Sequence, residues 1–234
     1  MKKFELTSET KINIFGKKLF RIKALISFAD VEAGETGGWV EKEGNVNQSG
    51  NAWVSGNAEV SGNAWVSDNA KVSGDAWVSG NAWVYGDAEV SGDAKVSGNA
   101  EVSGDAEVSG DAWVSDNAKV SGDAWVSGNA KVSGNAKVSG DAWVYGNAKV
   151  SGDAWVSDNA KVSGDADYTT IHGFGTQFRT TTFFRCKDKK VRVACGCFFG
   201  TIPEFREQVK NTRKGKIAEE YLMIADLMEN HFEK

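Results

Sequence analysis

The chain has 234 residues, a formal net charge of −5 at pH 7 and 41% hydrophobic residues, which suits one large domain or two small ones. No apolar run is long enough to span a bilayer, and the first ten residues, MKKFELTSET, lack the apolar segment of a secretory signal. Because three cysteines fit a reducing compartment better than a disulfide scaffold, we expect a cytoplasmic protein.

Residues 1–42 predict a small N-terminal β cap. Two strand-like stretches, 4–14 and 18–28, lie on either side of a turn at Phe15-Gly16-Lys17, and the segment 37–40 leads into a long repeat. A cap is expected here because the first coil of a repeat structure would otherwise expose a free strand edge.

Residues 43–168 carry the repeat. From Ser49 to Tyr168 there are 20 six-residue units with no insertion, and residues 43–48 fit the same frame. Ala at the fourth position and Val at the sixth predict a short strand with two inward side chains and one outward side chain. Ser-Gly-Asn or Ser-Gly-Asp then forms a corner. Three units make a triangular coil of 18 residues, so this region predicts about seven coils of a parallel β-helix.

Residues 169–234 predict a C-terminal α+β module. Stretches 178–187 and 190–199 are expected to form a β-hairpin, and residues 201–204 (TIPE) have the capping pattern of a helix start. A second helix is expected at about 216–232. Its apolar stripe comprises Ile217, Tyr221, Ile224, Met228 and Phe232, widened by Leu222 and Leu227.

That stripe has two interpretations. It can join copies of the chain into a homo-oligomer through the C-terminal helices, or it can fold back onto the hairpin as an intramolecular cap. Because its sequence is not repetitive, the C-terminal module is the preferred site of specific recognition. Its candidate protein-binding residues are Phe205, Tyr221, Ile224 and Met228.

The repeat and both ends resemble a known group of proteins. Written as V-S-G-N-A-x, the unit is similar to that of hexapeptide-repeat proteins, whose fold is the left-handed parallel β-helix. The segments 4–10, 21–25, 33–41 (AGETGGWVE) and 195–205 (CGCFFGTIPEF) resemble the ends of a hexapeptide-repeat family encoded by phages and prophages. The resemblance implies a left-handed helix and a protein made in a bacterial host cell, and it implies no reaction.

Acyltransferases with hexapeptide repeats use a histidine as a base, on the coils or on a loop extruded from them. The two histidines here, His172 and His231, both lie outside the repeats, and no loop interrupts them. Since acyl transfer then has no base, we expect no catalytic residue, no cofactor and no enzymatic activity. An acyltransferase ranks third among the functions considered.

Three cysteines, Cys186, Cys195 and Cys197, have the ligand chemistry of a zinc site together with His172. Their spacing does not match the usual paired-cysteine motif. Small buried hydrophobic residues in an intracellular sheet are the favoured interpretation, and Cys195 and Cys197 are expected on one face of a strand.

The outward position of the repeat carries eight tryptophans among lysines and glutamates. Tryptophan beside lysine can simply stack on a solvated rod, while exposed tryptophan is also typical of binding surfaces. The candidate protein-binding residues on the rod are Trp53, Trp125 and Trp143.

The corners carry columns of Asn and Asp. Residues 49–168 hold 17 acidic and seven basic side chains, so direct binding of nucleic acid is not expected. Bonds within the corner turns, a row of Ca²⁺ ions and mimicry of DNA are the alternatives for this acidity. The candidate metal ligands on one edge are Asp87, Asp105, Asp123 and Asp141.

The sequence thus predicts a non-enzymatic scaffold that binds a host or phage protein, with counter-defence as one role. It predicts no membrane segment. A structural component of an assembly is the alternative function.

Overall fold

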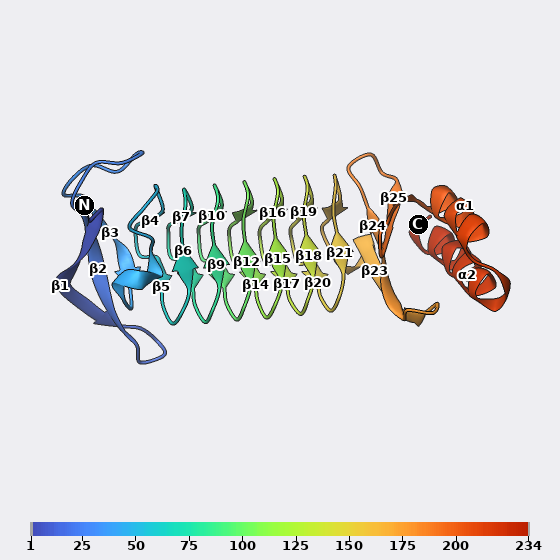
Figure 1. Cartoon of the computed structure of the whole chain (residues 1–234), viewed down its shortest axis with the longest axis horizontal. Helices are drawn as coiled ribbons and strands as arrows, with labels where there is room; N and C mark the ends of the chain where they lie inside the picture. The colour runs from blue at the N-terminus through green and yellow to red at the C-terminus, as the bar shows by residue number, and fades with distance from the viewer. Residues whose placement is uncertain (1, 234) are drawn as a thin grey trace.

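Alanine and valine fill the interior of a long solenoid. From Ala52 to Val162, the Ala and Val side chains of the repeat are buried and form one continuous core. The computed structural model describes residues 2–233, apart from the side chain of Asp165, and shows about seven parallel coils between an N-terminal cap and a C-terminal module (Figure 1). The predicted mainly β fold is confirmed.

Each side of the triangular rod is a parallel sheet in which residues 18 apart are paired. The β4 face contains β4 (Trp53–Val54), β7 (Lys71–Val72), β10 (Glu89–Val90), β13 (Glu107–Val108), β16 (Trp125–Val126), β19 (Trp143–Val144) and β22 (Lys161–Val162). The β5 face contains β5 (Glu59–Val60), β8 (Trp77–Val78), β11 (Lys95–Val96), β14 (Trp113–Val114), β17 (Lys131–Val132) and β20 (Lys149–Val150). The β6 face contains β6 (Trp65–Val66), β9 (Trp83–Val84), β12 (Glu101–Val102), β15 (Lys119–Val120), β18 (Lys137–Val138) and β21 (Trp155–Val156).

The corners explain the glycine content. Most corner glycines adopt a left-handed conformation, such as Gly104 with φ of +70°, and a Cβ there would lie 2.9 Å from the backbone nitrogen of Gly122. Asp116 replaces glycine at one corner and has φ of +60°. Its carboxylate accepts a hydrogen bond from the backbone N–H of Gly134 in the next coil, which offsets part of the strain.

The N-terminal cap consists of β1 (Phe4–Ile12), β2 (Lys18–Ala24), β3 (Thr36–Val40) and the short 3₁₀ segment Glu43–Asn45. β1, β2 and β3 are antiparallel, and β3 then pairs in parallel with β5, so the cap extends the β5 face. Lys3 closes the first coil: its buried ammonium donates to the backbone carbonyls of Gly50 and Ala52.

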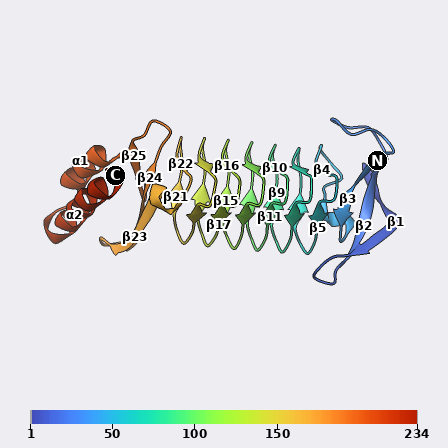
Figure 2. The ribbon, with the colours of Figure 1, turned by 180° about the vertical axis from the view of Figure 1, so that it is seen from behind.

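The C-terminal module is a four-stranded antiparallel sheet followed by two helices. After a 3₁₀ turn at Asp165–Asp167 come β23 (Tyr168–Phe174), β24 (Arg179–Arg185), β25 (Val191–Cys195) and β26 (Phe198–Thr201), then α1 (Ile202–Thr212) and α2 (Gly215–Phe232). The sheet separates the rod from the helices, which lie at the opposite end of the molecule from the N-terminal cap (Figure 2). Phe184 packs toward the last coil, whereas its neighbour Phe183 packs toward the helices.

Two local predictions have different outcomes. The capping pattern at residues 201–204 is confirmed, because Thr201 and Glu204 form a reciprocal capping box at the start of α1. The predicted second hairpin strand, 190–199, is wrong in its extent. Gly196, with φ of +62°, turns the chain after Cys195, and a separate strand begins at Phe198. Among the described residues, no helix is both long and apolar enough to cross a membrane.

Candidate functional site

The outward residues of the rod divide into covered and uncovered tryptophans. Trp53 is buried, because Phe4 and Phe28 of the N-terminal cap pack edge-on against its ring. Phe15, at the tip of the β1–β2 hairpin, stacks on Trp77 with ring centroids 4.2 Å apart. The exposed tryptophans are Trp65, Trp83, Trp113, Trp125, Trp143 and Trp155. Trp53 therefore does not lie on a surface that a partner could reach.

Trp125 and Trp143 lie on the β4 face as an edge-to-face pair with centroids 5.4 Å apart. The Lys187 ammonium, from the turn between β24 and β25, lies 4.2 Å from the centroid of the Trp143 ring. This end of the β4 face is therefore partly occupied by the protein's own C-terminal module.

The corner amides form ladders between coils. On the edge between the β5 and β6 faces, each Asn side chain donates to the Asn or Asp 18 residues later. The chain of bonds runs through Asn63, Asn81, Asn99, Asn117, Asn135 and Asp153. These bonds run along the rod and satisfy donors that single turns would leave to water.

The acidic edge, which carries consecutive aspartates, cannot form such a ladder of amide hydrogen bonds. Asp87, Asp105, Asp123 and Asp141 follow one another on the edge between the β6 and β4 faces, and carboxylates have no N–H group with which to continue the ladder. Lost hydration and repulsion from Asp105 and Asp141 raise the pKa of Asp123 above its ordinary value. Within residues 2–233, no three His, Cys, Asp or Glu side chains are grouped as a metal site would require.

The three cysteines lie in two separate places. Cys186 is buried at the junction with the last coil, where its residue bridges to Ala160, and burial raises the pKa of its thiol to about 11. Cys195 ends β25, and Cys197 follows in the turn at the other end of the β24–β25 pair. The structure therefore separates Cys186 from the other two, and the turn at Gly196 means that Cys195 and Cys197 do not share a strand.

The apolar stripe of α2 faces the protein's own sheet. Phe205, Tyr221, Ile224 and Met228 are buried in one cluster with Phe183 and Val193. The sequence left open whether this stripe joins copies of the chain or packs onto the hairpin. In the structure it packs onto the sheet of the same chain as an intramolecular cap. These four candidate binding residues thus lie inside the module, and the exposed apolar residues of α2 are Met223 and Leu227 instead.

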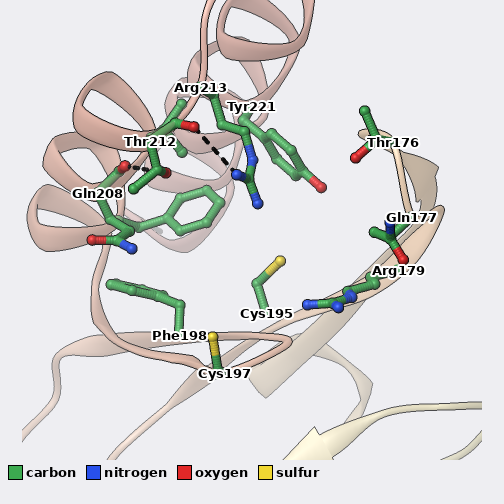
Figure 3. A pocket seen from close by; sticks show the side chains of 12 residues that line it. Thr176, Gln177, Arg179, Cys195, Cys197, Phe198, Gln208, Thr212, Arg213 and Tyr221 are labelled. Carbon is green, nitrogen blue, oxygen red and sulfur yellow. Dashed lines mark hydrogen bonds between the residues drawn. The ribbon is translucent and has the colours of Figure 1, made fainter.

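A cavity of about 370 Å³ opens between the C-terminal sheet and the helices. Arg179 and Cys195 approach it from the sheet, while Arg213 and Tyr221 approach it from the helices (Figure 3). Sequence reasoning did not connect these residues, because they are brought together only by the packing of α1 and α2 onto the sheet.

Part of the rod matches the sequence model of a known protein family. The family model for bactofilin, described as polymer-forming cytoskeletal, matches residues 83–173. The match covers about two thirds of the rod and most of β23, which together are less than half of the chain. No curated protein matches the chain.

This match corrects the family resemblance that was inferred from the sequence. The family that matches is bactofilin, and the resemblance to phage and prophage hexapeptide-repeat proteins is not supported. The repeat pattern does not identify a family, because an Ala-x-Val unit with a Gly-Asx corner specifies only a triangular coil. Unrelated solenoids need the same pattern. The left-handed sense of winding, which only the resemblance implied, stays a prediction.

Proposed function

We propose that this chain is a non-enzymatic structural protein whose rods associate side by side with a second copy of the same chain. The match to a polymer-forming cytoskeletal family supports a structural role and a cytoplasmic location. In this proposal residues 43–168 set a fixed length, while residues 1–42 and 169–234 act as separate end modules.

Both ends of the solenoid are covered, which directs association to the sides of the rod. At the N-terminal end, β3 and Lys3 occupy the edge of the first coil. At the other end, the backbone N–H of Trp155 donates to the hydroxyl of Thr182, and Phe184 packs into the rod core. A free coil edge could pair with another rod, but covered edges prevent such growth.

The observation that carries the proposal is the order of residues along the β6 face, which is complementary to itself. Along the rod this order is Trp65, Trp83, Glu101, Lys119, Lys137 and Trp155. When a second copy lies antiparallel on this face, Trp65 meets Trp155, Trp83 meets Lys137, and Glu101 meets Lys119. Every contact is then aromatic, cation–π or a pair of opposite charges.

The other two faces lack this property. An antiparallel pair of β4 faces would place Glu107 against Glu107 at its centre, and like charges in contact are unfavourable. On the β5 face, the N-terminal hairpin already covers Trp77 with Phe15, and Lys11 forms an ion pair with Glu59. The β6 face is therefore the side on which two rods fit best.

A two-fold pair built on this face has a mechanical consequence. Antiparallel rods place their two C-terminal modules at opposite ends of the pair, so the dimer is a spacer with one identical module at each end. At the usual ~4.8 Å between strands, six rungs give a contact only roughly 24 Å long. A contact of this length buries less surface than the interfaces of permanent dimers. We therefore expect the pair to dissociate on dilution.

Sedimentation velocity over a wide range of concentration tests the proposal. We expect a concentration-dependent dimer that Trp83→Ala weakens by about tenfold, because exposed tryptophans dominate such contacts. Trp125→Ala, an equal truncation on the β4 face, serves as the control and is expected to leave the dimer intact. A chain that stays monomeric, or a dimer lost only with Trp125→Ala, contradicts the proposal. A monomer that captures a stoichiometric host or phage protein would favour the binding scaffold predicted from the sequence.

A further inference from the structure

The cavity in the C-terminal module has the composition of a ligand site that the structural role does not explain. Its lining comes from five elements: the β23–β24 turn, β24, the β25–β26 segment, α1 and α2. Its volume of about 370 Å³ lies within the range of small-molecule sites in proteins. This observation is independent of how rods associate.

Two arginines give the cavity its charge. The guanidinium groups of Arg179 and Arg213 both point into the space between the sheet and the helices (Figure 3). No Asp or Glu is among the described residues that line the cavity. The arginine salt bridges within residues 2–233 involve Arg185, Arg192 and Arg206, so neither cavity arginine takes part in one. Among the hydrogen bonds of the described residues, the Arg213 guanidinium donates to the neighbouring carbonyl of Thr212, at 3.2 Å, and to no side chain. Two guanidinium groups without a carboxylate partner are suited to hold an anion.

A glycine in the β25–β26 turn leaves space for one of the arginine side chains. The Arg179 guanidinium lies against Gly196, and a Cβ at that position would collide with it. On the opposite wall, the hydroxyl of Tyr221 donates to the carbonyl of Phe174 at 3.2 Å, which fixes the ring at the mouth of the β23–β24 turn. Burial and the neighbouring Cys195 raise the pKa of the Tyr221 hydroxyl, and the positive charges of Arg213 and Arg179 oppose this shift in part. Tyr221 and both arginines line the same cavity.

The side of the cavity formed by β26 and α1 is partly apolar. Phe198, Phe205 and Val209 line it, together with the polar side chains of Gln208 and Thr212. A ligand with an acidic group at one end and an apolar group at the other therefore suits both the arginines and the aromatic side of the site. We propose that this cavity binds a small organic anion, a carboxylate or a phosphate ester, whose acidic group lies between Arg179 and Arg213 and whose apolar part contacts Phe198 and Phe205.

Isothermal titration calorimetry on the full chain tests the proposal with three probes: phenyl phosphate, benzoate and inorganic phosphate. We expect phenyl phosphate or benzoate to bind, and inorganic phosphate to bind more weakly because it leaves the aromatic side of the site uncovered. Arg179→Gln and Arg213→Gln are each expected to lower affinity by about tenfold, the usual loss for one charge-assisted hydrogen bond. Lys210→Gln removes the same charge from α1 outside the cavity and should change nothing.

A second measurement needs no knowledge of the ligand. Cys195 and Cys197 line the cavity, so their alkylation reports its charge, while buried Cys186 serves as a slow internal reference. We expect the ratio of the rate with iodoacetate to the rate with neutral iodoacetamide to fall several-fold in the double variant R179Q/R213Q, and not in K210Q. An unchanged ratio, or equal binding of the anionic probes to wild type and to the double variant, overturns the proposal.

Discussion

The Lys119 ammonium lies 2.8 Å from the Glu101 carboxylate of the preceding coil, at the middle of the β6 face. Both side chains remain partly exposed, so this surface pair contributes little to the stability of one rod. Its position matters more than its strength. In an antiparallel pair of rods the two-fold axis passes between these residues, and each then faces the opposite charge of the second copy.

The coil register predicts which deletions the rod tolerates. Removing residues 85–102 takes out one whole coil and joins Val84 to Ser103, which preserves the inward and corner positions. Removing 85–99 shifts the frame by half a unit and places corner residues in the core. We expect the first variant to unfold cooperatively near the wild-type temperature by circular dichroism, and the second to lose its β signal. Equal stability of the two variants contradicts the triangular coil.

The acidic edge is expected to destabilise the rod at neutral pH. Because the pKa of Asp123 is raised in the folded state, folding favours its protonated form, so this contribution to stability increases as pH falls through that pKa. Asp123→Asn removes the charge and supplies an amide donor toward Asp141. We expect it to stabilise the rod in urea unfolding at pH 7 and to have a smaller effect at pH 4.

The reciprocal substitution is the control for that prediction. Asn99→Asp places a carboxylate inside the continuous amide ladder and breaks its bond to Asn117, so it should destabilise the rod at pH 7. If millimolar Ca²⁺ stabilises the wild type and Asp123→Asn abolishes this gain, the column of Asp87, Asp105, Asp123 and Asp141 binds cations. In that case, binding of cations rather than repulsion between carboxylates would determine how the acidic edge affects stability.

Lys3 gives the N-terminal cap a pH dependence at alkaline pH. Burial lowers the pKa of its ammonium from 10.5 to about 8, so between these values the unfolded chain binds more protons than the folded chain. Stability contributed by this site therefore rises as pH increases from 7 to 9.5, by up to about 2 kcal/mol. The rise should disappear in Lys3→Met and persist in Lys2→Met, an exposed neighbour, when each is unfolded in urea. An identical pH profile for Lys3→Met and wild type contradicts this account.

Local pattern was sufficient to predict the rod. The alternation of Ala and Val fixes which side chains point inward, and the structure buries them throughout. The capping pattern at Thr201 likewise predicted the start of α1, because a helix end depends on a few neighbouring residues.

What the sequence could not predict depends on contacts between distant segments. Trp53 and Trp83 occupy the same place in their repeats, yet only Trp53 is covered by Phe4 and Phe28. The stripe of α2 fits equally an interface or an internal cap until the sheet that contacts it is known. Arg179 and Arg213 are far apart in sequence, and only the packed module brings both to one cavity.

Exchange of charge at the centre of the β6 face tests the central claim most directly. Glu101→Lys alone puts lysines at both central positions of each copy, and Lys119→Glu alone puts glutamates there, so each variant by itself is expected to be monomeric in sedimentation velocity. In an equal mixture, both central lysines of the first variant would face the central glutamates of the second. We therefore expect the mixture to restore the dimer. Dimers formed by either variant alone, or a mixture that stays monomeric while the wild type dimerises, would contradict antiparallel association through this face.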